Sequence, residues 1–106
     1  MAIIGTFTPM KDGYAGTIRT LTVNAKVHLI AIEEKSSDGA PDFRMLAGGF
    51  EIGAAWRHTK RGSDETYLRV KLDDPTLPQP VWAALLESSD DGIARLVWRR
   101  DKRGDA

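Results

Sequence analysis

The sequence predicts an all-β, mainly antiparallel fold, built as a small barrel or sandwich of about seven to eight short strands. Apolar and polar residues alternate in several short runs, as they do in strands with one buried face. Turn-forming Gly, Asp, Ser and Pro residues separate these runs at short intervals. With 106 residues, 42% of them hydrophobic, the chain is long enough for one core, so we expect a single β-rich domain over residues 1–106.

The expected strands follow one another along the whole chain, separated by turn signals such as Asp12-Gly13 and Gly48-Gly49. They cover residues 3–8, 14–23, 26–34, 43–49, 51–60, 66–72, 80–88 and 92–100. The clearest alternation is in 66–72, where one face carries Leu68, Val70 and Leu72 and the other carries Tyr67, Arg69 and Lys71. The same rule groups Ile52, Ala54 and Trp56 against Arg57, and Ala94, Leu96 and Trp98 against Arg95.

Residues 80–87 fit two structures. Pro80 followed by a run of Ala and Leu could form a short helix, because these residues have high helix propensity and Pro is tolerated in a first turn. The run is short, however, and it lies between two turns where the antiparallel pattern needs a strand. We favour the strand.

Composition limits the function classes. Fifteen basic and fifteen acidic residues cancel, so the whole chain lacks the net charge typical of nucleic-acid or membrane partners. There is no cysteine, which excludes disulfides, thiolate metal sites and thiol nucleophiles, and fits a reducing compartment. No run approaches the roughly 18 apolar residues of a membrane span, and the first residues do not resemble an export signal. We therefore expect a cytoplasmic protein with no membrane partner.

Asp73-Asp74, at the end of the run 66–72, is the pair that most resembles a catalytic or metal-binding group. Its position before Pro75 favours a simpler role, since the residue before proline is held extended and an Asp carboxylate accepts backbone N–H bonds in turns. Neither His28 nor His58 completes a metal or hydrolase motif with it. We expect a strand terminator, no catalytic residue, no metal, no cofactor and no enzyme activity.

The arrangement of charge is more informative than its sum. Acidic residues concentrate in the expected turns, whereas basic residues occupy outward positions of the expected strands. If the strands 66–72 and 92–100 are near one another, they form a basic face that could bind nucleic acid, with cations on phosphates and an aromatic ring on a base. Its predicted residues are Arg57, Tyr67, Arg69, Lys71, Arg95 and Arg99, and residues 98–104 would extend it. A solvated sheet face rich in Lys and Arg would show the same pattern.

The three tryptophans, Trp56, Trp82 and Trp98, are expected to anchor the core. Trp82 is the exception left open, because it lies in the ambiguous segment 80–87 and could be exposed.

Six ordered blocks resemble a known family. They are IGTF, GTIRTLTVNAKVHL, APDFR, EIGAAW, YLRVKLDDP and LVWRR, and together they cover nearly the whole chain. This set is similar to the domain of unknown function 736, a family of small bacterial proteins often met on plasmids and integrated conjugative elements. The resemblance implies that Asp73-Asp74-Pro75 is shared within the family, and it implies no catalytic residue.

Three functional hypotheses follow. The first is a non-enzymatic binding module of mobile genetic elements, which binds nucleic acid or a nucleoprotein complex through the basic face. The alternative is a protein-interaction or regulatory module, including a homodimer formed by pairing of edge strands. An enzyme that uses Asp73, Asp74 or a histidine is the least supported, because the sequence keeps these groups apart.

Overall fold

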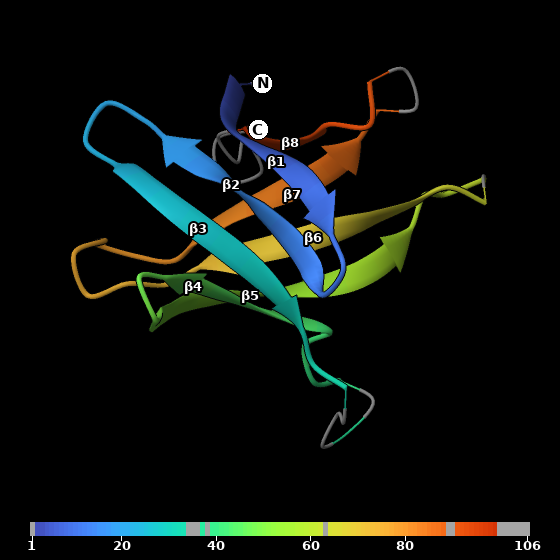
Figure 1. The fold of residues 1–106 in the computed structure, drawn as a ribbon, viewed down its shortest axis with the longest axis horizontal. Helices are drawn as coiled ribbons and strands as arrows, with labels where there is room; N and C mark the ends of the chain where they lie inside the picture. The colour runs from blue at the N-terminus through green and yellow to red at the C-terminus, as the bar shows by residue number, and fades with distance from the viewer. Residues whose placement is uncertain (1, 34–36, 38, 63, 89–90, 100–106) are drawn as a thin grey trace, which may run out of the picture.

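The computed structural model describes residues 2–33, 37, 39–62, 64–88 and 91–99. Eight antiparallel strands follow one another in chain order around a closed barrel, and none of the described residues is helical (Figure 1). The strands are β1 (Ala2–Met10), β2 (Gly13–Arg19), β3 (Asn24–Ala31), β4 (Phe43–Ala47), β5 (Phe50–Thr59), β6 (Thr66–Leu72), β7 (Val81–Glu87) and β8 (Ala94–Trp98). The predicted all-β class is confirmed. Of the two predicted architectures, a barrel or a sandwich, the structure has the barrel.

Most of the segment 80–87, which the sequence leaves between helix and strand, forms strand β7. Ala83 and Leu85 are buried in the barrel, whereas Trp82 and Ala84 alternate with them on the outer side, where Trp82 is 41% exposed. This two-residue period matches a strand, and β7 pairs on one side with β6 and on the other with β8. Pairing with two neighbours satisfies the backbone groups on both sides of the strand, which outweighs the helix propensity of Ala and Leu.

The core fills the barrel from all eight strands. Inward residues alternate with outward ones, so each strand contributes one to three buried side chains. The buried set is Phe7, Ile18, Val27, Leu29, Phe43, Met45, Ala55, Leu68, Val70, Leu72, Ala83, Leu85, Ala94 and Leu96. No polar or charged side chain is buried among the described residues, so the interior is held by apolar packing.

A β-bulge in β5 changes the face assignment that strict alternation predicts. Met45 of β4 pairs with Gly53, but its neighbour Leu46 pairs with Glu51, which leaves Ile52 as the extra residue. Beyond the bulge Ala55 is fully buried, so Trp56 lies on the outer side and Arg57 on the same side as Ala55. The prediction that Ile52 and Trp56 share a face is therefore wrong, because the bulge shifts the alternation by one residue.

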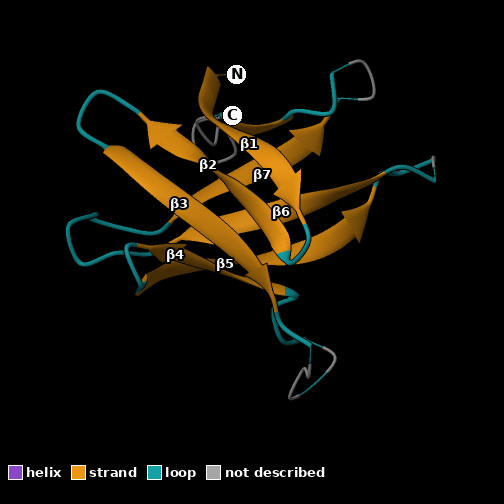
Figure 2. Ribbon diagram, in the orientation of Figure 1, coloured by secondary structure: helices purple, strands orange, loops and turns teal. Residues whose placement is uncertain are grey.

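The barrel has two different ends. One end carries the loops 20–23, 48–49 and 73–80, which lie at the left of Figure 2. The hairpin loop Gly48-Gly49 there is tight, with φ values of 59° and 91° that glycine adopts without strain. At the opposite end the chain passes from β1 to β2, from β3 to β4, from β5 to β6 and from β7 to β8. We call the first end the apolar mouth and the second the polar mouth, for the side chains described below.

Strands β1 and β2 approach closely at Gly16, so we expect a larger side chain there to lower the stability. A Cβ atom on Gly16 would lie 2.1 Å from the Thr6 carbonyl oxygen and 2.7 Å from Phe7, so Gly16→Ala must displace the backbone or the ring. We expect a loss of about 1–3 kcal/mol in the free energy of unfolding, measured by urea denaturation. Gly39→Ala is the control, because its Cβ would meet nothing within 4 Å. Equal stability of the two variants would contradict this packing.

Candidate functional site

The outer side of β5, β6 and β7 carries a cluster of aromatic and basic side chains. Register places Trp56 opposite Arg69, and His58 opposite Tyr67, across the β5–β6 pair. Lys71 lies opposite Trp82 across the β6–β7 pair. These positions alternate with the buried core residues and therefore point away from the barrel interior. We call this cluster the aromatic–basic face, and its members are Trp56, His58, Tyr67, Arg69, Lys71 and Trp82.

Trp82 is at the centre of the closest contacts on this face. The Arg69 guanidinium carbon lies 4.7 Å from the centroid of the Trp82 ring, and Lys71 Nζ lies 5.7 Å from it. The Trp56 ring lies 5.8 Å from the Trp82 ring at an interplanar angle of 35°. These distances are within the range of cation–π and aromatic pair interactions. Trp82 is thus held in place by its neighbours and remains 41% exposed.

A second aromatic pair lies further along the same two strands. The rings of His58 and Tyr67 are stacked, with centroids 5.8 Å apart and planes 25° from parallel. Trp56 is fixed from another direction, because its Nε1–H donates to the Gly39 carbonyl oxygen at 3.0 Å. The face therefore presents two aromatic groups, the Trp56–Trp82 pair beside Arg69 and Lys71 and the His58–Tyr67 pair further along β5 and β6.

The charges on this outer side are not equally available. Arg95 Nη2 lies 2.8 Å from Asp91 Oδ2, and this hydrogen bond lowers the pKa of the Asp91 carboxyl to about 2. Lys71 Nζ is 3.9 Å from Asp73. Within the part of the chain that the structure describes, no salt bridge involves Arg69. Arg69 is therefore the basic group of this face best placed to meet an external phosphate.

Of the six predicted binding residues, the structure brings Tyr67, Arg69 and Lys71 together on β6 and places Arg95 on the outer side of β8. Arg99 follows β8 and is exposed. Residues 100–104, predicted to extend the basic face, lie outside the described residues.

Arg57 does not lie where the sequence predicts. It was expected on the outer basic face, but it lies at the polar mouth, with its guanidinium carbon 5.4 Å from the centroid of Phe43. There it joins Tyr14, whose hydroxyl donates to Glu87 Oε1 at 3.1 Å. Burial and the Glu87 carboxylate raise the pKa of Tyr14, and Arg57 opposes this rise. The bulge in β5 explains the displacement, since it moves Arg57 to the inward set.

One of the three tryptophans differs from expectation. Trp98 packs against the core, as predicted, whereas Trp56 lies on the outer side. Trp82, whose exposure the sequence leaves open, also lies on the outer side. In β7 the signal was present in the sequence, because a strand that buries Ala83 and Leu85 must turn Trp82 outward. In β5 no comparable signal exists, because the bulge depends on pairing with β4.

Asp73 and Asp74 terminate β6, as the sequence predicts. The Asp73 backbone N–H donates to Ile52 O at 2.8 Å, the last bond of the β5–β6 ladder. Asp74 Oδ2 accepts from the backbone N–H of Thr76 at 3.0 Å and from its hydroxyl at 2.5 Å. These bonds lower the pKa of Asp74. Among the described residues no group of three or more metal-ligating side chains surrounds this pair or any other point.

A cavity of about 510 Å³ opens at the apolar mouth. Core-facing side chains of the strands form its walls, and the loops 20–23 and 73–80 contribute its rim. The lining residues are Ala2, Ile4, Ile18, Thr20, Thr22, Val23, Ala25, Val27, Ala47, Ile52, Leu72, Asp74, Thr76, Leu77, Val81 and Trp98. Leu21 and Phe50, in or beside loops of this end, are exposed by 101% and 76%.

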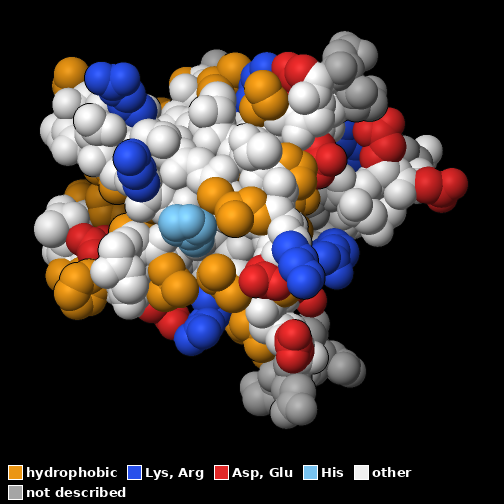
Figure 3. Space-filling view, in the orientation of Figure 1, with side chains coloured by type: hydrophobic (Ala, Val, Ile, Leu, Met, Phe, Trp, Pro, Cys, Tyr) orange, Lys and Arg blue, Asp and Glu red, His pale blue; other side chains and the backbone are white. Residues whose placement is uncertain are grey.

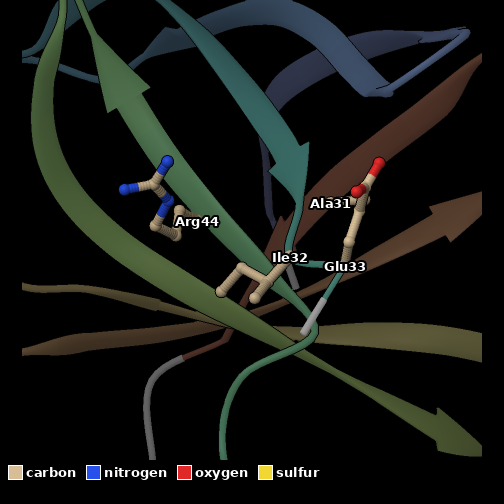
Figure 4. Close-up of a pocket in the computed structure, with 4 residues that line it drawn as sticks. All are labelled: Ala31, Ile32, Glu33 and Arg44. Atoms are coloured by element: carbon tan, nitrogen blue, oxygen red, sulfur yellow. The ribbon is translucent and has the colours of Figure 1, made fainter. Parts of the chain in front are cut away.

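A second hollow lies between the end of β3 and β4 and is more open to solvent than the cavity at the apolar mouth. Figure 4 shows the residues that line it, Ala31, Ile32, Glu33 and Arg44. The Arg44 guanidinium lies 3.8 Å from Glu51. Figure 3 shows the side of the barrel on which β2 and β3 lie in front, where basic and acidic side chains are interspersed. In the described part of the chain there is no helix long and apolar enough to span a membrane.

Comparison with known proteins gives one match. The family model described as a protein of unknown function, DUF736, matches residues 3–101. No curated protein and no solved structure matches the chain. The match covers nearly the whole chain and confirms the resemblance found in its six sequence blocks.

At the polar mouth, burial and the Glu87 carboxylate raise the pKa of Tyr14, which can be tested by titration. Its phenol should titrate above the ordinary value of 10.0, and Glu87→Gln should lower its pKa by removing the neighbouring negative charge. The pKa should stay above the ordinary value in the variant, because burial is the larger cause. Absorbance of tyrosinate in a Tyr67→Phe background measures Tyr14 alone, since the chain has two tyrosines. An unchanged pKa in Glu87→Gln would contradict the contact.

Proposed function

The chain belongs to the DUF736 family, and we propose that it binds single-stranded nucleic acid through the aromatic–basic face. The observation that carries this proposal is the exposed Trp82 ring with Arg69 and Lys71 beside it. Proteins that bind single strands combine aromatic rings, on which bases stack, with cations that contact the phosphates. The face supplies both kinds of group from three adjacent strands of a rigid barrel.

The contacts can be assigned by chemistry. Trp82 and the His58–Tyr67 pair are the stacking positions, because each presents an aromatic surface on the outer side of the barrel. Arg69 lies between them on β6 and contacts phosphate or stacks its guanidinium plane on a base. Arg95, held by Asp91, and the exposed Arg99 lie at the margin, where they contribute long-range attraction.

Single strands suit this face better than duplex. Base stacking on a protein ring requires unpaired bases, which a duplex does not offer without being opened. The zero net charge also argues against dominant, sequence-independent binding to duplex phosphates. The proposed role is that of a non-enzymatic, cytoplasmic binding module that acts in mobile genetic elements on nucleic acid or on a nucleoprotein complex.

The alternative function, a homodimer, lacks its simplest mode of association, which is the pairing of edge strands. Pairing of edge strands needs an unpaired edge, and each of the eight described strands has a neighbour on both sides in the closed barrel. A protein partner would have to use side chains instead. Such a partner is an outcome that the following experiment distinguishes.

Fluorescence anisotropy of labelled single- and double-stranded DNA, at low and near-physiological salt, tests the proposal. We expect the single strand to bind more tightly, and Trp82→Ala to weaken that binding by about 1–3 kcal/mol, the value of one stacked base. Arg69→Ala should flatten the dependence of log K on log salt by about 0.7, the loss of one phosphate contact.

The matched control compares two lysines. Lys71→Ala removes a charge from the aromatic–basic face, whereas Lys26→Ala removes one from an outward position of β3. Lys71→Ala should weaken binding more than Lys26→Ala, with circular dichroism showing that both variants fold. Equal losses, a preference for duplex, or no binding at low salt would refute the proposal and direct the search to protein partners.

A further inference from the structure

The cavity at the apolar mouth has the size of a small-molecule site. Ligand sites in proteins are typically about 300–1,000 Å³, and the cavity measures about 510 Å³. Eight-stranded barrels can hold one small ligand in this position, where the side chains no longer fill the space between the strands. The cavity opens at the end of the barrel, whereas the aromatic–basic face lies on its outer side, so the two sites can be occupied independently.

The walls of the cavity are apolar and its polar groups lie at the rim. Ile4, Ile18, Val27, Ile52 and Val81 project from five different strands into the cavity. The polar lining residues belong to the two rim loops, as Thr20 and Thr22 in one and Asp74 and Thr76 in the other. A ligand with a hydrocarbon body and one polar end matches this distribution.

The hydroxyls at the rim are already engaged in their own turns. Thr20 Oγ1 accepts the backbone N–H groups of Thr22 and Val23 at 3.3 and 3.1 Å. The hydroxyl and the backbone N–H of Thr76 both donate to Asp74 Oδ2. No hydrogen bond to the other carboxylate oxygen of Asp74 is made by the described residues, so Oδ1 is available to a ligand.

Charge decides which polar end fits. Among the described residues that line the cavity, Asp74 is the only one with an ionisable side chain, and none of the described Lys, Arg or His residues lines it. The hydrogen bonds from Thr76 lower the pKa of Asp74, which keeps it ionised at neutral pH. A carboxylate or phosphate at the end of a ligand would be repelled there, whereas an ammonium would be attracted.

We propose that the apolar mouth binds a small hydrophobic amine, with its hydrocarbon part in the cavity and its ammonium group on Asp74 Oδ1. The exposed Leu21 and Phe50 enlarge the apolar surface around the entrance and favour capture of such a molecule. The site is separate from the proposed nucleic-acid face and does not depend on it.

Displacement of a neutral fluorescent probe, N-phenyl-1-naphthylamine, tests the site. The probe should brighten on binding one site per chain, because it enters an apolar environment. Decylamine should then displace it at lower concentration than decanol, and decanol at lower concentration than decanoate. The three competitors share one chain length, so the order reports the head group alone.

Two variants with the same loss of charge locate the ammonium site. Asp74→Asn should reduce the preference for decylamine over decanol by about fivefold, the effect expected for one partly exposed ion pair. Asn retains an oxygen for the Thr76 bonds, so the turn is preserved. Asp73→Asn is the control, because Asp73 does not line the cavity and its carboxylate lies near Lys71. Ala25→Phe should abolish probe binding by filling the cavity, and circular dichroism checks its fold.

Several outcomes would overturn the proposal. These are the absence of probe binding, displacement by decanoate as effective as by decylamine, or an amine preference that persists in Asp74→Asn. Probe binding that survives in a folded Ala25→Phe variant would place the ligand elsewhere. A dimer in sedimentation that dissociates in the Leu21→Ser, Phe50→Ser variant, together with no probe binding, would assign the mouth to a second copy of the chain.

Discussion

Hydrogen bonding between β1 and β8 closes the barrel, and the other features of the molecule depend on it. The two strands pair antiparallel from Ala2 opposite Trp98 to Phe7 opposite Ala94, with a bulge between Ile3 and Gly5. Closure gives every described strand two neighbours, so no backbone edge is left open. It also separates the side chains into an enclosed inner set and an outer set, and it creates two ends of different chemistry.

The two proposed sites meet in one hairpin. Leu72 and Val81 face inward and line the cavity, whereas their chain neighbours Lys71 and Trp82 face outward. Side chains alternate along a strand, so adjacent residues can serve different surfaces without competing for space. The loop 73–80 between these strands supplies Asp74 to the rim of the cavity. The turn that ends β6 thus also supplies the one charged side chain among the described residues that line the cavity.

The barrel is asymmetric from end to end. At the polar mouth, Tyr14 and Glu87 form a hydrogen bond beside Arg57 and Phe43. At the apolar mouth mostly small and aliphatic side chains, together with Trp98, line the space between the strands, which stays open as the cavity. Unfilled apolar space costs contact energy in a protein, and the proposed ligand would restore these contacts.

The sequence by itself determined the local structure: the all-β class, seven to eight strands, the turn at Asp73-Asp74 and the outward positions of Tyr67, Arg69 and Lys71. These follow from alternation and turn chemistry, which act between neighbours in the chain. Only the tertiary structure decided that the sheet closes, that a bulge sends Trp56 outward and Arg57 to the polar mouth, and that Asp74 lines a cavity. These features depend on which strands pair and in which register, and such contacts join residues far apart in the sequence.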